Sequence, residues 1–306
     1  MTTLMRRYLS TLLLLACTTL LSSALYAAQP IKTLLITGQD GSHYWKGASQ
    51  GIEKILENSG LFEVDMLITP DFGEDINRFE PNFKGYNLVI INYGGATWKE
   101  SVRKAFEKYV SDGGGVVVLH SSIIPMEDWP AYNEMTGLGA WNGRDERWGP
   151  FVYWKDGQYV YDYSPGYAGY HGLQHETIID TRAPGHPIMQ GLPPRWKHFK
   201  DEIYTKLRGP GRNMEILATI EENGRHEPIM WTVRYGKGRV FVDVLGHCGN
   251  DPEMIYSILC TGFQVTLLRG AEWAATGNVT QPAPKDFPLE DTYTLRPEFK
   301  APFHAY

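Results

Sequence analysis

Three histidines each close or closely follow a short apolar run. His43 lies in GQDGSH after LLIT, His120 closes VVVLH, and His247 closes VDVLGH. Histidine exchanges protons near neutral pH, and its neutral ring binds metals. Taken singly, each is better explained as a hydrogen-bonded structural residue. Brought to one edge of a sheet, the three predict a proton-transfer site or, with a carboxylate, a divalent-metal site, although these three histidines are not in HxH or HxxxH spacing.

Two adjacent acids, Asp201 and Glu202, precede Tyr204 in HFKDEIY and could supply that carboxylate. Adjacent side chains point in different directions on a regular element, so a solvated acidic pair is the alternative. Glu227, beside His226 in RHEP, is a weaker candidate. The sequence holds no GxCxG nucleophile motif, and no glycine-rich dinucleotide or NTP phosphate loop.

Alternating strand and helix signals over residues 32–120 predict the elements that position these residues. Apolar runs indicate strands at 34–36, 62–68, 88–93 and 116–119, with amphipathic helices between several of them. Thr97 to Glu100 matches a capping box that would open one helix. The last of these runs is apolar on both faces, as a central parallel strand requires. The fold class is therefore α/β, with a doubly wound, mostly parallel sheet that binds ligands beyond its carboxyl ends.

Further strands are predicted at 176–179, 215–219, 229–233 and 239–245. A last helix is expected to begin at Asp251 and to carry Ile258 and Leu259. The stretch 139–173 interrupts the alternation of strand and helix signals. Its apolar residues do not follow the 3.6-residue spacing of a helix, and ten of residues 141–170 are Trp, Tyr or Phe. An aromatic-rich insertion, either a loop or a hairpin lying over the sheet, is expected there.

The composition excludes several classes of protein. The chain has 306 residues, 29 Lys and Arg against 35 Asp and Glu, and a net charge of −6, which argues against binding to nucleic acid. Nine Trp and eighteen Tyr suit a wet binding cleft. Two of the three cysteines, Cys248 and Cys260, lie in the second half of the chain. They could form a disulfide if the protein is exported, although Cys260 lies in an apolar run typical of a core.

The first 28 residues read as a signal peptide. Arg6 and Arg7 precede a long apolar stretch, and small residues surround Ala27 and Ala28. Lipidation of Cys17 is the less favoured alternative. We therefore expect a periplasmic or secreted protein with no stable membrane span after cleavage.

The chain resembles the trehalose-utilisation (ThuA-like) family over nearly all of residues 32–278. The resemblance is carried, in order, by VVVLHSS, GRDERWGP, GYHG, HPIMQGLP, KDEIY, LRGPGRNMEILAT, RHEPIMWTVRYGKGRVF, LGH and RGAEWAATG. The family is similar in fold to class I glutamine amidotransferases. Like the family, this chain lacks the elbow cysteine, so amidotransferase chemistry is not implied. Many relatives carry a second histidine shortly before Leu-Gly-His, which VFVDVLGH lacks.

The resemblance implies a role in sugar catabolism beside oxidoreductases that make 3-keto-glycosides, and cleavage of the keto-sugar. It implies a set of catalytic candidates: His43, His120, Asp201, Glu202 and His247. It also implies a set of substrate-binding candidates: Trp45, Arg144, Asp145, His171, Tyr204 and Glu227. No cofactor is certain, but His43, His120 and His247 would be the ligands of a divalent metal.

The expected reaction is cleavage of the glycosidic bond by elimination. A ketone at C3 acidifies the C2 proton, and its removal allows the C1 oxygen to leave. His247 or His120 would be the base, and Asp201 or Glu202 the orienting group or acid. The alternatives are a non-catalytic carbohydrate-binding protein and a scaffolding protein.

The predicted organisation is a signal peptide over 1–28, one α/β domain over 29–276 with its insertion at about 139–173, and an extended tail over 277–306. The expected partner is a small-molecule sugar, and a homo-oligomer is compatible with the sequence.

Overall fold

The structure is a computed structural model that describes residues 29–141, 143–222, 224–249 and 257–300. The chain divides into two units, residues 1–30 and residues 31–306, and every described helix and strand belongs to the second. The predicted signal peptide and the predicted helix start at Asp251 lie outside the described residues.

Five parallel strands form the first half of the sheet, in the order β2-β1-β3-β4-β11. Their bounds are β1 Ile31–Gly38, β2 Phe62–Ile68, β3 Leu88–Tyr93, β4 Gly115–Leu119 and β11 Gly238–Asp243. Strand β4 is buried throughout, as expected for a central parallel strand. The chain moves outward from β1 to β2 and then returns to β3 on the other side of β1. This reversal is the point at which open α/β sheets bind ligands.

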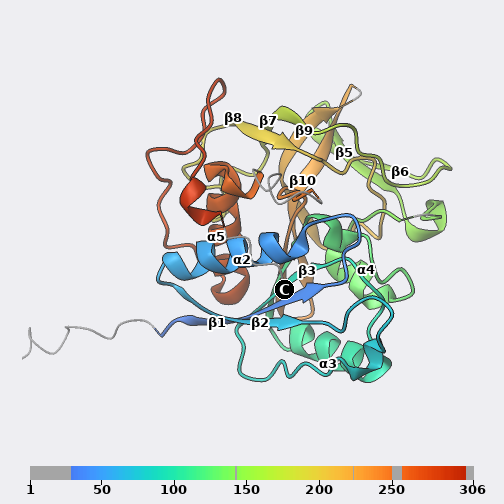
Figure 1. Ribbon diagram of the computed structural model, residues 1–306. Coiled ribbons are helices and arrows are strands. Elements are labelled where there is room, and N and C mark those ends of the chain that lie inside the picture. Colours follow the sequence, from blue (N-terminus) through green and yellow to red (C-terminus); the bar gives the residue numbers. More distant parts are fainter. Residues whose placement is uncertain (1–28, 142, 223, 250–256, 301–306) are drawn as a thin grey trace, which may run out of the picture. The chain divides into compact units, whose positions relative to one another are not determined.

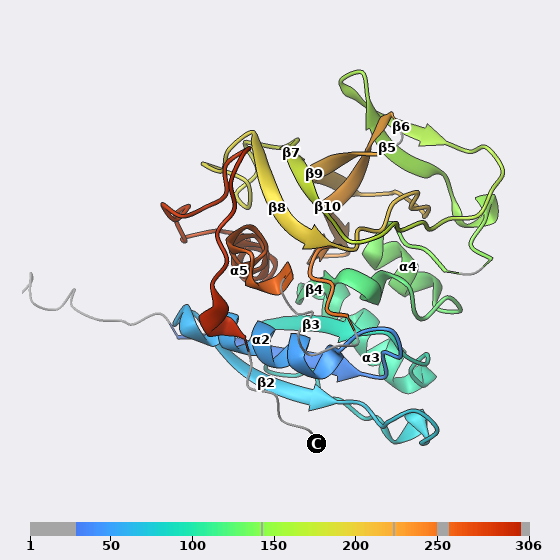
Figure 2. The same ribbon diagram turned by 45° about the horizontal axis from the view of Figure 1, so that its top comes forward.

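Helices cover both faces of this half, as Figures 1 and 2 show. Helix α2 (Trp45–Asn58) contacts β1 and β2 and packs beside α5 (Thr261–Thr276), which covers β4 and β11. Helix α3 (Glu100–Ser111) and helix α4 (Pro130–Thr136) lie on the opposite face. The doubly wound α/β class predicted from the sequence is confirmed.

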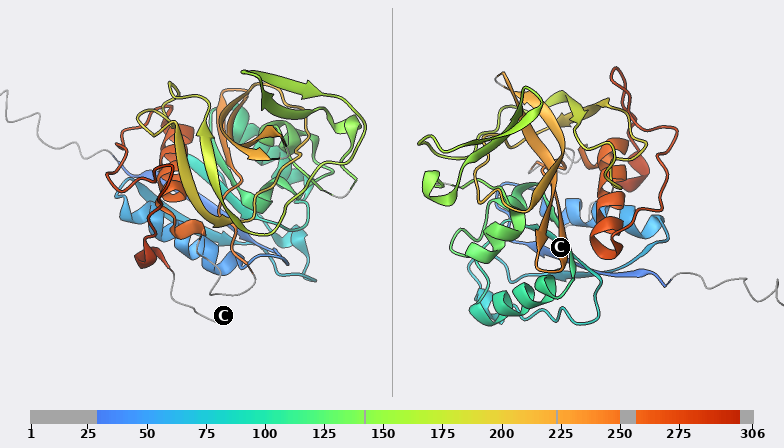
Figure 3. Two further views of the ribbon diagram at one scale, coloured as in Figure 1. Left: turned by 90° about the horizontal axis from the view of Figure 1, so that it is seen from above. Right: turned by 180° about the vertical axis from the view of Figure 1, so that it is seen from behind.

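The second half of the sheet is antiparallel and continues from β11 in the order β10-β9-β7-β8. The bounds are β7 His175–Thr181, β8 Arg195–Asp201, β9 Met214–Glu222 and β10 Arg225–Tyr235. The aromatic insertion contains a hairpin, β5 (Phe151–Lys155) and β6 (Gln158–Asp162), which pairs with β10. Figure 3 shows the hairpin projecting beyond the sheet.

Several local predictions were wrong. Lys99, rather than Thr97, is the N-cap of α3, and the Thr97 hydroxyl donates to Asp128. Ser257–Leu259 forms a 3₁₀ turn, and α5 begins only at Thr261. Strand β8 was missed because RWKHFKD mixes charges with inward-facing Trp196 and His198, whose burial depends on distant partners.

The described part of the tail, residues 277–300, runs along this unit. Backbone N–H groups of Lys197, Thr261 and Arg296 donate to the carbonyls of Leu289, Thr294 and Leu259. Cys248 and Cys260 are buried free thiols. None of the helices among the described residues is long and apolar enough to cross a membrane.

Candidate functional site

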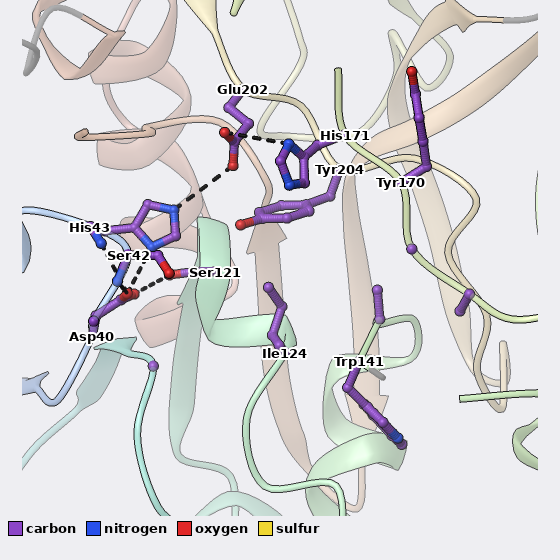
Figure 4. Close-up of a pocket in the computed structure, with 15 residues that line it drawn as sticks. Asp40, Ser42, His43, Ser121, Ile124, Trp141, Tyr170, His171, Glu202 and Tyr204 are labelled. Carbon is purple, nitrogen blue, oxygen red and sulfur yellow. Dashed lines mark hydrogen bonds and ion pairs between the residues drawn. The ribbon is translucent and has the colours of Figure 1, made fainter. Parts of the chain in front are cut away.

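His43 lies on the loop that follows β1, and Asp40 fixes that loop. The Asp40 carboxylate accepts hydrogen bonds from the backbone N–H groups of Ser42 and His43, both at 3.1 Å, and from Ser121 Oγ at 2.7 Å. It also lies 2.8 Å from Nδ1 of His43. The His43 ring is therefore held with its Nε2 facing Glu202, as Figure 4 illustrates.

His120 and His247 follow the neighbouring parallel strands β4 and β11. His120 has a φ of 44°, a backbone conformation that is sparsely populated outside glycine and recurs at functional sites. Its Nδ1 lies 2.8 Å from the carbonyl oxygen of Val244, and its Nε2 lies 3.2 Å from Nδ1 of His247. Both rings are nearly inaccessible to solvent.

Asp201 and Glu202, at the end of β8, point in different directions. Asp201 is fully buried and accepts hydrogen bonds from the backbone N–H groups of Gly246 at 2.8 Å and His247 at 3.0 Å. Its Oδ2 also lies 2.9 Å from Nε2 of His198. The Asp201 carboxylate therefore positions the His247 turn from behind, and it does not reach the pocket.

Glu202 faces the histidines instead. Its Oε1 lies 3.9 Å from Nε2 of His43 and 3.6 Å from Nδ1 of His247, and its Oε2 lies 3.4 Å from Nδ1 of His171. The rings of His43, His120 and His247 form a triangle with centroids 4.9, 4.9 and 5.2 Å apart. The structure thus brings the three predicted histidines and one of the two predicted acids into one cluster.

The three histidines of this cluster differ in their pKa values, because their surroundings differ. Burial disfavours a charged His43, but the carboxylates of Asp40 and Glu202 prevail and raise its pKa to about 9. Complete burial and the neighbouring imidazoles hold the pKa of His120 well below its usual range. Burial also lowers the pKa of His247, although Glu202 opposes the shift. At neutral pH the positive charge therefore resides on His43.

A pocket of about 670 Å³ opens in front of this cluster. His43 and Glu202 line one side, together with Tyr204, and the insertion supplies Trp141 and Tyr170 on the other. Gly94, which follows β3, has no room for a side chain, because a Cβ at this position would lie 2.6 Å from the Asp40 carboxylate. The pocket joins an ionisable wall to an aromatic one.

Four predicted substrate-binding residues do not line this pocket. Arg144 is fully buried, donates to Asn133 and stacks on Trp141, so it supports the aromatic wall from behind. Asp145 pairs with Arg147. Glu227 is buried, pairs with Arg225 and accepts from the backbone of Lys206. Trp45 is the first residue of α2. His171 and Tyr204 do line it.

Sequence reasoning did not identify Asp40, although GQDGSH is typical of a turn in which an aspartate accepts backbone hydrogen bonds. His198 and its contact with Asp201 left no recognisable signal in the sequence.

The metal-ligating types in this cluster are His43, His120, His247 and Glu202. Each offers one ligand atom, and these atoms all lie within 4.8 Å of one another. Three imidazole nitrogens and one carboxylate oxygen form a donor set suited to a divalent transition metal.

Comparison with known proteins agrees with this architecture. The profile of the trehalose-utilisation (ThuA) family matches residues 32–274. A putative ThuA-like protein from Parabacteroides merdae is 48% identical, with a TM-score of 0.86 over 90% of this chain and 100% of that one. A second, from Bacteroides uniformis, is 20% identical with a TM-score of 0.54 over 85% and 97%, and it supports the fold alone. No curated protein matches the chain. The chain therefore belongs to the ThuA family, whose description, trehalose utilisation, indicates a sugar-related role.

Proposed function

We propose that this protein cleaves the glycosidic bond of 3-keto-glycosides by elimination. The observation that carries the proposal is the cluster of three histidines and Glu202, of which His43 and Glu202 line one wall of a pocket whose other wall is aromatic. Sugar-related membership of the ThuA family supports the substrate class.

The reaction needs a base, a stabiliser of negative charge and a proton donor. The base takes the C2 proton, and the electron pair of the broken C2–H bond forms an enolate with the C3 ketone. The enolate then forms the C1–C2 double bond while the C1–O bond breaks. The aglycone oxygen leaves with that electron pair and takes up a proton, so the products are an unsaturated keto-sugar and an alcohol.

His171 is the base in this proposal. The Oε2 of Glu202, 3.4 Å away, orients the His171 ring through Nδ1 and leaves Nε2 for the substrate. An acid that orients a histidine through its other nitrogen is the arrangement used by many general bases. His171 lines the pocket and is half exposed, so a sugar can reach it.

The other two needs are met beside it. His43 keeps its proton next to the Asp40 carboxylate and places positive charge where the enolate oxygen would form. Burial and nearby carboxylates raise the pKa of Tyr204, so its hydroxyl keeps a proton that it can donate to the leaving oxygen.

The aromatic wall accounts for binding. Trp141 and Tyr170 line the side of the pocket opposite Glu202. A pyranose ring has an apolar C–H face and a rim of hydroxyls, which Trp and Tyr match with a flat ring and a polar tip. A volume of about 670 Å³ accommodates a small glycoside.

The test is incubation of the purified protein with a 3-keto-glucoside that carries a chromogenic aglycone. We expect release of the aglycone, a fall in kcat of about 100-fold in His171→Gln, and no change in the control His175→Gln, whose side chain is exposed. Binding without release would instead identify a non-catalytic carbohydrate-binding protein. Neither binding nor release would favour a scaffold.

The proposal places the reaction outside the cytoplasm. Arg6, Arg7 and the apolar stretch that follows them support export with loss of residues 1–28. N-terminal sequencing of the protein from the periplasm or medium should begin at Gln29. A lipid-modified start at Cys17, or an intact Met1 in the cytosol, would contradict cleavage at that site.

A further inference from the structure

We propose that His43, His120, His247 and Glu202 together bind one divalent transition-metal ion. Three closest approaches are 3.2 Å between His120 Nε2 and His247 Nδ1, 3.6 Å between His247 Nδ1 and Glu202 Oε1, and 3.9 Å between His43 Nε2 and Glu202 Oε1. Donors about 2.1 Å from a tetrahedral metal lie about 3.4 Å apart. The cluster is therefore close to the spacing of a coordination shell.

Hydrogen bonds behind the rings fix which nitrogen faces the cluster. Nδ1 of His43 lies 2.8 Å from Asp40 Oδ1, and Nδ1 of His120 lies 2.8 Å from the carbonyl oxygen of Val244. Since a carbonyl only accepts, His120 carries its proton on Nδ1 and turns the lone pair of Nε2 inward when the ring is neutral. Ligating histidines characteristically donate their outer N–H to a carboxylate or carbonyl in this way.

The supports of these ligands are rigid. His120 and His247 follow two adjacent parallel strands, and the buried Asp201 carboxylate holds the backbone of the His247 turn. The Asp40 carboxylate, which holds the His43 ring, is itself held by the Ser121 hydroxyl. Four ligands from four separate segments are thus pre-positioned, which lowers the cost of ordering them around an ion.

The donors select the class of metal. Three imidazoles with one carboxylate suit Zn²⁺, Fe²⁺, Ni²⁺ or Mn²⁺, whereas Mg²⁺ and Ca²⁺ prefer shells made of oxygen. A bound cation would replace the proton on Nε2 of His43 and keep positive charge at the same wall of the pocket. His43 and Glu202 line that wall, so a ligand can approach the ion. The metal site itself does not depend on the proposed function; within that function, the ion would polarise the substrate ketone.

The experiment measures metal content directly. The protein is purified without a histidine tag, stripped with a chelator, reloaded with Zn²⁺ or Co²⁺, and desalted for elemental analysis. We expect about one ion per chain, a Tm that rises with metal concentration, and a visible absorption spectrum for the Co²⁺ form. His43→Gln and His247→Gln should each lower the affinity at least tenfold, whereas His175→Gln should retain it.

The outcomes separate the two proposals. Less than one ion per ten chains with no change in Tm would overturn the metal site, as would undiminished binding in a folded His247→Gln variant. Circular dichroism of each variant establishes that it is folded. Metal binding without cleavage of 3-keto-glycosides would leave the site standing and remove the function. Cleavage that persists in fully stripped protein, together with a failure to take up metal, would overturn the metal site and leave the proposed function standing.

Discussion

The parallel and antiparallel halves of the sheet supply different parts of the pocket. Strands β1, β4 and β11 are followed by His43, His120 and His247. Hydrogen bonds hold the rings of His43 and His120 and the backbone of His247. The antiparallel half and the insertion supply Glu202, His171, Tyr204 and the aromatic wall. The side chains of His43 and His247 are 9% and 7% exposed, whereas that of His171 in the insertion is 51% exposed.

This difference separates the buried histidine cluster from the exposed base His171 and the aromatic wall. Groups at the ends of buried parallel strands are fixed by the core, whereas groups on an insertion can change without disturbing it. Substitutions in or behind the histidine cluster should therefore lower kcat, and substitutions in the aromatic wall should raise KM.

Glu202 joins the two halves, so its replacement should have the largest effect. Glu202→Gln removes the negative charge that faces His43, His247 and His171. We expect kcat on a 3-keto-glucoside to fall about 1,000-fold or more. Glu176→Gln, at an exposed acid that pairs with Lys197, is the control. A fall of less than tenfold in Glu202→Gln would show that Glu202 does not connect the two halves in the reaction.

Asp201 tests whether a residue outside the pocket supports the cluster. In Asp201→Asn the two backbone N–H groups of Gly246 and His247 lose a charged acceptor in a fully buried position. We expect a loss of about 3 kcal/mol in the free energy of unfolding, measured in urea, and about 100-fold in kcat. Asp145→Asn, whose partner Arg147 is exposed, should change the free energy of unfolding by less than about 0.5 kcal/mol. Equal stability of the two variants would contradict the role of Asp201.

The same two halves differ in how far the sequence predicts them. Apolar runs ending in His120 and His247 indicate parallel strands, and carboxyl ends of parallel strands share one edge, so the convergence of the histidines followed from pattern alone. The antiparallel half offered no such rule. Strand β8 buries His198 and Asp201 beside each other, and a buried ion pair reads in the sequence as a polar surface.

Arg144 and Asp40 both show that residue type alone does not reveal the partner of a charged side chain. Arg144 was expected to bind substrate and does not line the pocket, whereas Asp40 was not expected at the site and lines it. Arg144 looked like a sugar ligand, but its guanidinium is buried against Trp141 and Asn133. Asp40 looked like a turn residue, but it also orients His43. Residue type and spacing indicate which groups are available, whereas the partner that satisfies each buried charge comes from distant segments.

Trp141 tests the aromatic wall. Trp141→Ala removes the largest side chain that the insertion contributes to the pocket, and we expect KM to rise about tenfold while kcat stays within about threefold. Trp154→Ala, in the hairpin and outside the pocket lining, is the matched control. A fall in kcat with an unchanged KM would mean that Trp141 acts in the chemistry, as His171 of the same insertion does, and would contradict its assignment to binding.

Asp243, at the end of β11, is expected to affect stability alone, in a way that depends on pH. Complete burial raises its pKa to about 7, although hydrogen bonds from Leu245 and Thr266 oppose the shift. Between its usual pKa and about 7 the folded protein holds a proton that the unfolded chain has released. The stability that this proton contributes is complete below the usual pKa and is lost as pH rises through 7.

The free energy of unfolding of the wild type should therefore contain a component that falls between about pH 4 and 7, by at most about 1.4 kcal/mol per pH unit. Asp243→Asn should remove that component and leave activity near that of the wild type, because the side chain does not line the pocket. Urea unfolding at several pH values measures it, with Asp180→Asn as the control. Parallel curves for wild type and Asp243→Asn would show that the region around Asp243, at the end of β11, is not a low-dielectric core. The contrast between a fixed and an adaptable half of the site would then lose its physical basis.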